Sequence, residues 1–128
     1  MIDHIGFSVS DYLRAKTFYA KALTPLGYGI AMEVTKAESG GKYEGAGFGD
    51  RKPCFWISAG DALKGPLHVA FAAKSRAAVD AFYKAAIAAG AKDNGPPGLR
   101  PHYHPNYYGA FVLDPDGHNI EAVCHTPA

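Results

Sequence analysis

Alternating apolar positions mark the start of each half of the chain. The segment HIGFSV, from residue 4, and the segment HVAF, from residue 68, alternate large apolar residues with small or polar ones. This period of two is typical of a strand with one buried face. The two segments therefore predict strands that present His4 and His68 on the face opposite to the apolar side chains.

A helical spacing of apolar residues follows each of these strands. Ser10 or Asp11 can cap the first helix, and Pro25 ends it. Ser75 can cap the second helix, and Gly90 ends it. The apolar face of the first helix is predicted to comprise Ala15, Phe18, Tyr19 and Ala22. That of the second is predicted to comprise Val79, Phe82, Tyr83 and Ile87.

Short strand-like segments follow each helix and complete a repeat. We expect strands near 28–36, 43–49 and 54–59 in the first half, and near 91–93, 107–113 and 118–125 in the second. The turn DPDG joins the last two as a hairpin, because Gly117 can adopt positive φ. Each half is thus a strand, a helix and three strands, and its sheet must be covered by another half. The pattern predicts an α+β fold in one domain, residues 1–128, with module one at about 1–62 and module two at about 63–128.

Composition narrows the functional classes. Of the 128 residues, 48% are hydrophobic and 20% charged, which excludes wholesale disorder. The net charge of +1 and the absence of basic runs argue against nucleic-acid binding. No apolar stretch approaches the ~20 residues of a membrane span, and the N-terminus does not resemble a signal peptide. Cys54 and Cys124 are expected to be reduced buried thiols, which is consistent with a cytoplasmic protein.

Strand alternation also suggests a metal site. His4, His68 and Glu121 all fall on the strand faces that point away from the helices. Two imidazoles and one carboxylate suit Fe(II), Mn(II), Ni(II), Co(II) or Zn(II) and leave coordination positions open. The alternative is that each histidine is an ordinary core or edge residue and that the glutamate pairs with a lysine.

Four segments carry a resemblance to a known family. MIDHIGFSVSD, FYAKAL, GPLHVAF and above all AFVLDPDGHNIEAV resemble the vicinal oxygen chelate superfamily, which includes glyoxalase I, extradiol dioxygenases, and the fosfomycin and bleomycin resistance proteins. The resemblance covers essentially the whole chain. It implies two βαβββ modules whose curved mixed sheets surround a central cleft. It also implies metal ligands on the first and last strands of the modules, which here are His4, His68 and Glu121.

The fourth ligand position departs from the glyoxalase I pattern. The residue related to Glu121 by the repeat is Trp56, in the segment KPCFWISAG, and an indole cannot ligate a metal. This departure argues against lactoylglutathione lyase activity. The remaining set is similar to the two-histidine, one-carboxylate triad of extradiol dioxygenases. Trp56 is expected either to form an aromatic wall for a substrate or to fill core space.

The segment LRPHYHPNYYGAF is dense in chemically useful side chains. We assign candidate catalytic roles as general acid or base to His104 and Tyr108. Candidate substrate-binding residues are Trp56, Arg100, His102 and Tyr107, with Arg100 suited to a carboxylate. The alternative is a proline-stiffened surface loop whose aromatic side chains pack locally or form a dimer contact.

The expected function is that of a metal-dependent lyase or dioxygenase of this superfamily. Adjacent oxygens of a small substrate would chelate a divalent ion that acts as a Lewis acid. One alternative is a metal-free binding protein, like the bleomycin-sequestering relatives, and another is a purely structural interaction domain. The resemblance implies a homodimer, with the modules paired within one chain or swapped between two.

Overall fold

The computed structural model describes residues 1–128 and contains the predicted repeat. The first half comprises β1 (Ile5–Val9), α1 (Tyr12–Leu23), the short 3₁₀ helix η1 (Thr24–Leu26), β2 (Gly29–Val34), β3 (Gly45–Gly49) and β4 (Phe55–Ala59). The second half comprises β5 (His68–Ala72), α2 (Arg76–Ala88), β6 (Lys92–Leu99), β7 (Tyr108–Leu113) and β8 (Asn119–Cys124). The α+β class and the two βαβββ modules are confirmed.

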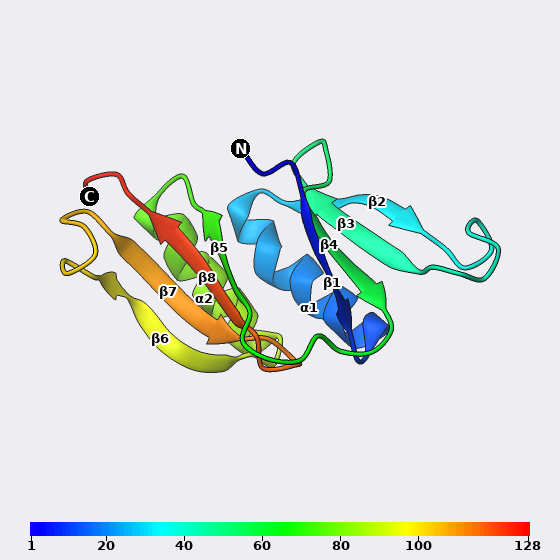
Figure 1. Cartoon of the computed structure of the whole chain (residues 1–128). Coiled ribbons are helices and arrows are strands. Elements are labelled where there is room, and N and C mark those ends of the chain that lie inside the picture. The colour runs from blue at the N-terminus through cyan, green and yellow to red at the C-terminus, as the bar shows by residue number, and fades with distance from the viewer.

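Each module forms its own four-stranded mixed sheet. The strand orders are β1-β4-β3-β2 and β5-β8-β7-β6. In each sheet the first and last strands of the module are parallel neighbours, and the other pairs are antiparallel. Figure 1 shows the two sheets beside each other with both helices packed on the same side of them. The sheets remain open, so one chain does not close them around a cleft.

The helix-facing side chains of both sheets join in a single core of 22 buried residues. All four side chains predicted for the apolar face of the first helix are buried. In α2, Val79 and Phe82 are buried as predicted, whereas Ile87 is 37% exposed. Ala86 is buried instead, because it lies seven residues after Val79 and therefore on the same helix face. The predicted stripe was thus wrong at its last position.

The helix ends agree with the capping residues in the sequence. Asp11 and Ser75 are the N-caps, and each side chain accepts a hydrogen bond from a backbone N–H three residues later, at 3.1 Å. Ser10, the other candidate cap, has a different role: its backbone N–H donates to Asp116 Oδ2 at 3.1 Å. The DPDG turn of module two is therefore fixed to the end of β1 in module one.

The strand after α2 is longer than predicted. It was expected only near 91–93, but β6 extends from Lys92 to Leu99 and includes the segment NGPPGL. Its two prolines are tolerated because β6 is the outermost strand and pairs only with β7. The pairing shifts register twice, between Asp93 and Gly95 and between Gly95 and Gly98.

No helix of the chain has the length and apolar character needed to traverse a bilayer.

Candidate functional site

His68 and Glu121 lie together on the sheet face opposite α2. His68 Nε2 is 2.8 Å from Glu121 Oε1. The Glu121 side chain is 0% exposed, whereas 52% of the His68 side chain is open to solvent. The buried carboxylate is thus reached from solvent past an exposed imidazole. This is the geometry that strand alternation predicted for module two.

Tyr107 is bonded to the other oxygen of the same carboxylate. Its hydroxyl donates to Glu121 Oε2, so each carboxylate oxygen has one side-chain partner. Burial, and then the hydrogen bond and charge of Glu121, raise the pKa of the Tyr107 phenol. The phenol therefore stays protonated and remains a donor at neutral pH.

Phe111 and Arg100 extend this site along the sheet. Phe111 pairs directly with Glu121 across β7 and β8, so the two side chains share one face. The Phe111 ring lies 6.1 Å from the His68 ring and 5.4 Å from the Arg100 guanidinium carbon. Phe111 was not among the predicted site residues. Counting back from the four-residue DPDG turn would have paired Glu121 with Ala110, whereas the observed loop includes His118, so that Leu113 pairs with Asn119 and residue 111 lies opposite residue 121.

Module one carries a second group of predicted residues. His4 and Trp56 line one depression of about 360 Å³, whose remaining lining residues are Gly6, Val34 and Tyr43. A Cβ at Gly47 would lie 2.7 Å from Trp56 Cε2, which shows that the indole rests directly on the backbone of β3. Trp56 is half-buried and points away from the core that Phe55 and Ile57 enter. It is not a core-filling residue.

The strand register shows how the two modules correspond. Gly6 pairs with Trp56 in module one, and Ala70 pairs with Glu121 in module two. Gly6 and Ala70 each lie two residues after the histidine of their module. Trp56 therefore occupies the position of Glu121 in the repeat, as the sequence indicated.

The structure does not bring all the predicted residues together. His4 Nδ1 lies 2.7 Å from Asp3 Oδ1, and its side chain is 61% exposed. Within one chain, no group of three or more histidine, cysteine, aspartate or glutamate side chains could hold a metal ion. We call His4 and Trp56, with the depression that they line, the first half-site. We call His68 and Glu121 the second half-site.

The remaining loop residues lie beside or behind the second half-site. Tyr108 points to the helix side, where its hydroxyl donates to Asp80 Oδ1 at 2.6 Å. The His102 ring packs on Tyr103, whose ring packs in turn on Tyr107. His104 packs against His125, which also contacts Tyr107. Among the predicted loop residues, Tyr107 is the one that hydrogen-bonds Glu121.

The two donors of the second half-site fit a divalent ion. Ligand atoms that are about 2.1 Å from one ion and at right angles to each other lie about 3.0 Å apart. The observed 2.8 Å between His68 Nε2 and Glu121 Oε1 is close to that separation. A neutral imidazole and a buried carboxylate also form a donor set that suits first-row transition metals. Two donors leave at least two positions to be filled from elsewhere.

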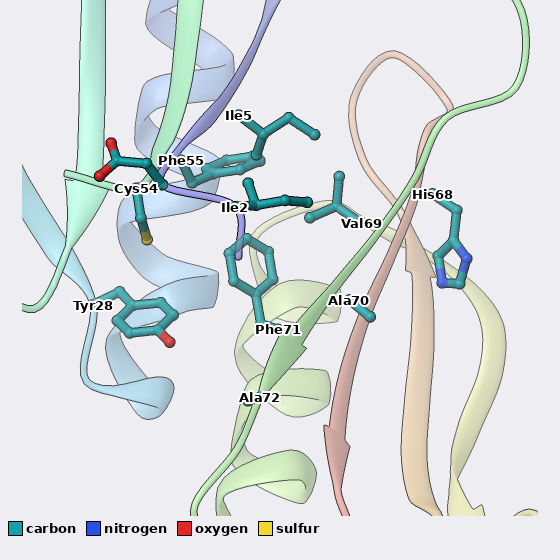
Figure 2. Close-up of a pocket in the computed structure, with 11 residues that line it drawn as sticks. Ile2, Ile5, Tyr28, Cys54, Phe55, His68, Val69, Ala70, Phe71 and Ala72 are labelled. Carbon is teal, nitrogen blue, oxygen red and sulfur yellow. The ribbon is translucent and has the colours of Figure 1, made fainter.

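An apolar groove of about 360 Å³ separates the two half-sites. It is lined by the facing strands β1, β4 and β5, with Ile5, Phe55 and Phe71 among its walls. Figure 2 shows Val69 and Phe71 on the groove side of β5 and the His68 ring on the other side of the strand. His68 and Ala70 also line the groove, so it borders the face that carries Glu121 along β5.

Comparisons with known proteins agree with this fold. A model of the Glyoxalase/Bleomycin resistance protein/Dioxygenase superfamily matches residues 1–122. No match was found among proteins with curated functions. A glyoxalase/bleomycin resistance protein from Albidiferax ferrireducens T118 is 29% identical, with a TM-score of 0.77 over 97% of this chain and 98% of that one.

Two further solved structures share the fold at lower identity. A glyoxalase/bleomycin resistance protein/dioxygenase family enzyme from Burkholderia phytofirmans PsJN is 22% identical, with a TM-score of 0.66 over 98% of both chains. A mutant of the fosfomycin resistance protein FosX from Listeria monocytogenes, complexed with Mn(II) and 1S,2S-dihydroxypropylphosphonic acid, is 19% identical. Its TM-score is 0.70 over 98% of this chain and 90% of that one.

Proposed function

Because the chain belongs to the Glyoxalase/Bleomycin resistance protein/Dioxygenase superfamily, we propose that it is a divalent-metal enzyme acting on a small oxygenated substrate. The observation that carries this proposal is the pairing of His68 Nε2 with the fully buried Glu121 carboxylate, 2.8 Å apart and accessible past the exposed imidazole. Burying a carboxylate is costly unless it is hydrogen-bonded, and Glu121 is held at this position by its bonds to His68 and Tyr107. The FosX structure complexed with Mn(II) shows that this fold can accommodate a divalent ion.

In this proposal His4, His68 and Glu121 hold the metal. The ion, when bound, supplies Lewis-acid polarisation of adjacent substrate oxygens. Fe(II), Mn(II), Ni(II), Co(II) and Zn(II) all suit two imidazoles and a carboxylate. Trp56 lacks a ligand atom, so a fourth protein donor is missing and substrate oxygens have more positions available. A lyase or dioxygenase of the vicinal oxygen chelate type fits this set better than a lactoylglutathione lyase.

We further propose that the complete site forms in a homodimer. The His4 half-site and the Glu121 half-site are on separate open sheets, and no three-ligand group forms within one chain. The edge strands β1, β2, β5 and β6 each have one side without a strand partner, and such edges can pair with another chain. His4 of the partner subunit would then complete the ligand set of His68 and Glu121.

The substrate would lie between Trp56 and the loop that follows β6. The indole is supported from below by Gly47, so its exposed face offers a flat apolar wall. His102 and Tyr107, whose rings pack on Tyr103, would border the same space once the partner subunit brings the two half-sites together.

Among the loop residues we assign the catalytic role to His104. The backbone N–H of Asn106 donates to His104 Nδ1 at 3.0 Å, so the neutral ring carries its proton on Nε2. That nitrogen can donate a hydrogen bond to a substrate oxygen on which negative charge develops. Tyr108 was the other candidate, but its hydroxyl is committed to Asp80 on the helix side.

Metal titration tests the proposal directly. Metal-stripped protein is titrated with Mn(II), Co(II), Ni(II), Zn(II) or Fe(II), and binding is followed by calorimetry and by the shift in melting temperature. We expect His4→Ala, His68→Ala and Glu121→Ala each to weaken binding at least tenfold. His102→Ala, a histidine change in the nearby loop, is the matched control. Parent-like binding by both His68→Ala and Glu121→Ala would reject the metal site.

A metal-free binding protein is the second candidate function. The observation that favours it is the half-buried indole of Trp56, which shares its depression with Tyr43. Trp56 is the only tryptophan, so its fluorescence reports ligands at this site alone. Quenching by a planar ligand in metal-stripped protein, unchanged in strength when metal is restored, would support this candidate over the metalloenzyme.

Two free cysteines are consistent with a cytoplasmic location for either function.

A further inference from the structure

Arg100 is a fixed cation without an acidic partner. Nη1 donates to the carbonyl oxygen of Gly98 and Nη2 to that of Pro96, both at 2.8 Å. The guanidinium also packs over the Phe111 ring at 5.4 Å. Arg100 takes part in none of the ion pairs of the chain. A guanidinium has five N–H donors, so three remain free beyond the two that bond the backbone.

The backbone of β6 is shaped to accommodate this side chain. A Cβ on Gly95 would lie 3.2 Å from Nη2, and a Cβ on Gly98 would lie 3.2 Å from Nη1. Gly95 also has a φ of +147°, which other residues rarely adopt. The guanidinium therefore lies close against a strand whose side chains are absent at both contact points.

Phe111 places Arg100 at a limited distance from the proposed metal ligands. Its ring is 6.1 Å from the His68 ring and 5.4 Å from the guanidinium carbon, so these two groups lie no more than about 11.5 Å apart. Phe111 also pairs with Glu121 across the strands. A small molecule can span from the carboxylate region to Arg100 by lying on the Phe111 ring.

We propose that the substrate has, in addition to its chelating oxygens, an oxyanion such as a carboxylate that binds Arg100, with a planar apolar spacer over Phe111. This inference rests on the proposed metalloenzyme function and adds a substrate class to it. Planar forked donors match a carboxylate in geometry and charge. The preformed guanidinium would lose little conformational freedom on binding.

A matched pair of probes tests the anion site. Catechol and 3,4-dihydroxybenzoate share the chelating oxygens and the ring but differ in one carboxylate. We expect Mn(II)-loaded protein to bind the carboxylate-bearing probe about tenfold to a hundredfold more tightly, the range for a charge-assisted hydrogen bond. Arg100→Ala should abolish this preference, and Arg100→Lys should retain part of it. Arg76→Ala is the control, because Arg76 packs over Tyr108 on the helix side.

The outcomes separate this inference from the proposed function. Metal-dependent binding of both probes with equal affinity, or a preference that persists in Arg100→Ala, would reject the Arg100 site and leave the metal site standing. Failure of 3,4-dihydroxybenzoate to bind would also reject it. Binding of both probes regardless of metal would count against the metalloenzyme itself.

The contact between Tyr107 and Glu121 carries a second inference. With Tyr107 bonded to Oε2, only Oε1 of Glu121 faces His68 Nε2. We propose that Tyr107 is a positioning residue that limits Glu121 to one coordinating oxygen, which preserves an extra open position for substrate. This inference also rests on the proposed metal site. Hydrogen-bond partners of metal ligands typically change metal affinity by 10–100-fold.

Metal affinity and the spectrum of bound Co(II) test this role without a substrate. We expect Tyr107→Phe to weaken Co(II) binding about tenfold or more and to alter the visible absorption, because the freed carboxylate can bind through both oxygens. Tyr108→Phe is the matched control, since its hydroxyl bonds Asp80 instead. Unchanged or tighter binding with an unchanged spectrum in Tyr107→Phe, while His68→Ala still loses metal, would reject the positioning role alone.

Discussion

The hydroxyl of Tyr19 donates to Asp114 Oδ2 at 2.5 Å, and this buried hydrogen bond joins helix α1 of module one to the DPDG turn of module two. The other Asp114 oxygen, Oδ1, accepts the backbone N–H groups of Asp116 and His118, both at 2.9 Å. One carboxylate therefore organises the hairpin turn before β8 and connects it to the other half of the chain. The strand that carries Glu121 begins directly after this turn.

Removing the Tyr19 hydroxyl should destabilise the protein. Tyr19→Phe keeps the ring but leaves a buried Asp114 oxygen without its donor, which typically costs about 1–3 kcal/mol. Urea denaturation of the two proteins measures the difference. Tyr83→Phe is the control, because the Tyr83 hydroxyl bonds Asp93 at an exposed position. A loss in Tyr19→Phe no larger than that in Tyr83→Phe would contradict the structural role of the bond.

The same tyrosine should make the protein sensitive to alkali. Burial, and then the charge of Asp114, raise the pKa of Tyr19 well above its usual value of 10.0. The unfolded state then loses this proton at lower pH than the folded state does. The stabilisation is complete below pH 10 and declines as the pH rises above it. Unfolding free energies measured between pH 9 and pH 11 should fall more steeply in the parent than in Tyr19→Phe, and parallel curves would contradict this.

The close packing of Trp56 on β3 should make Gly47 intolerant of a side chain. A Cβ there would lie 2.7 Å from both Trp56 Cε2 and Pro53 Cβ. Gly47→Ala is expected to cost about 1–3 kcal/mol and to shift the emission of the single tryptophan, because the indole must move. Gly29→Ala is the control, since a Cβ at that strand position meets nothing within 4 Å. Equal stability and an unshifted spectrum would contradict the close packing of the indole on Gly47.

Mixed variants should reveal whether the metal site lies between chains. His4→Ala and Glu121→Ala are each expected to bind metal weakly when alone. If they are unfolded together and refolded, a mixed dimer has one interface with an intact set of His4, His68 and Glu121. We expect up to one tight site per mixed dimer, measured by Mn(II) titration. A mixture that binds no better than its separate components would place the complete site within one chain or nowhere.

Periodicity was sufficient for the order and type of the elements and for the face on which most side chains lie, although not for the length of β6. Alternation placed His68 and Glu121 on the same face of one sheet, and they are in contact. It could not relate this face to that of His4, because the relative position of the two modules depends on long-range contacts such as that between Ser10 and Asp116. No local sequence pattern predicts that the Tyr107 side chain reaches Glu121 from its loop either.

The error in β6 has a physical explanation. Prolines 96 and 97 lack a backbone N–H, and this usually argues against a strand. At a sheet edge only one side of the strand needs donors, and bulges can bypass the missing ones. An edge position is a property of the assembled sheet, so the sequence of this segment alone did not predict it.

Trp56 and Glu121 stand at matching points of a duplicated unit, one on β4 and the other on β8. At these matched points β8 has an anionic donor, whereas β4 has an aromatic ring. The internal symmetry of this protein is therefore a property of the backbone. Because the side chains of the two halves differ chemically, a ligand that contacts both has one favoured orientation.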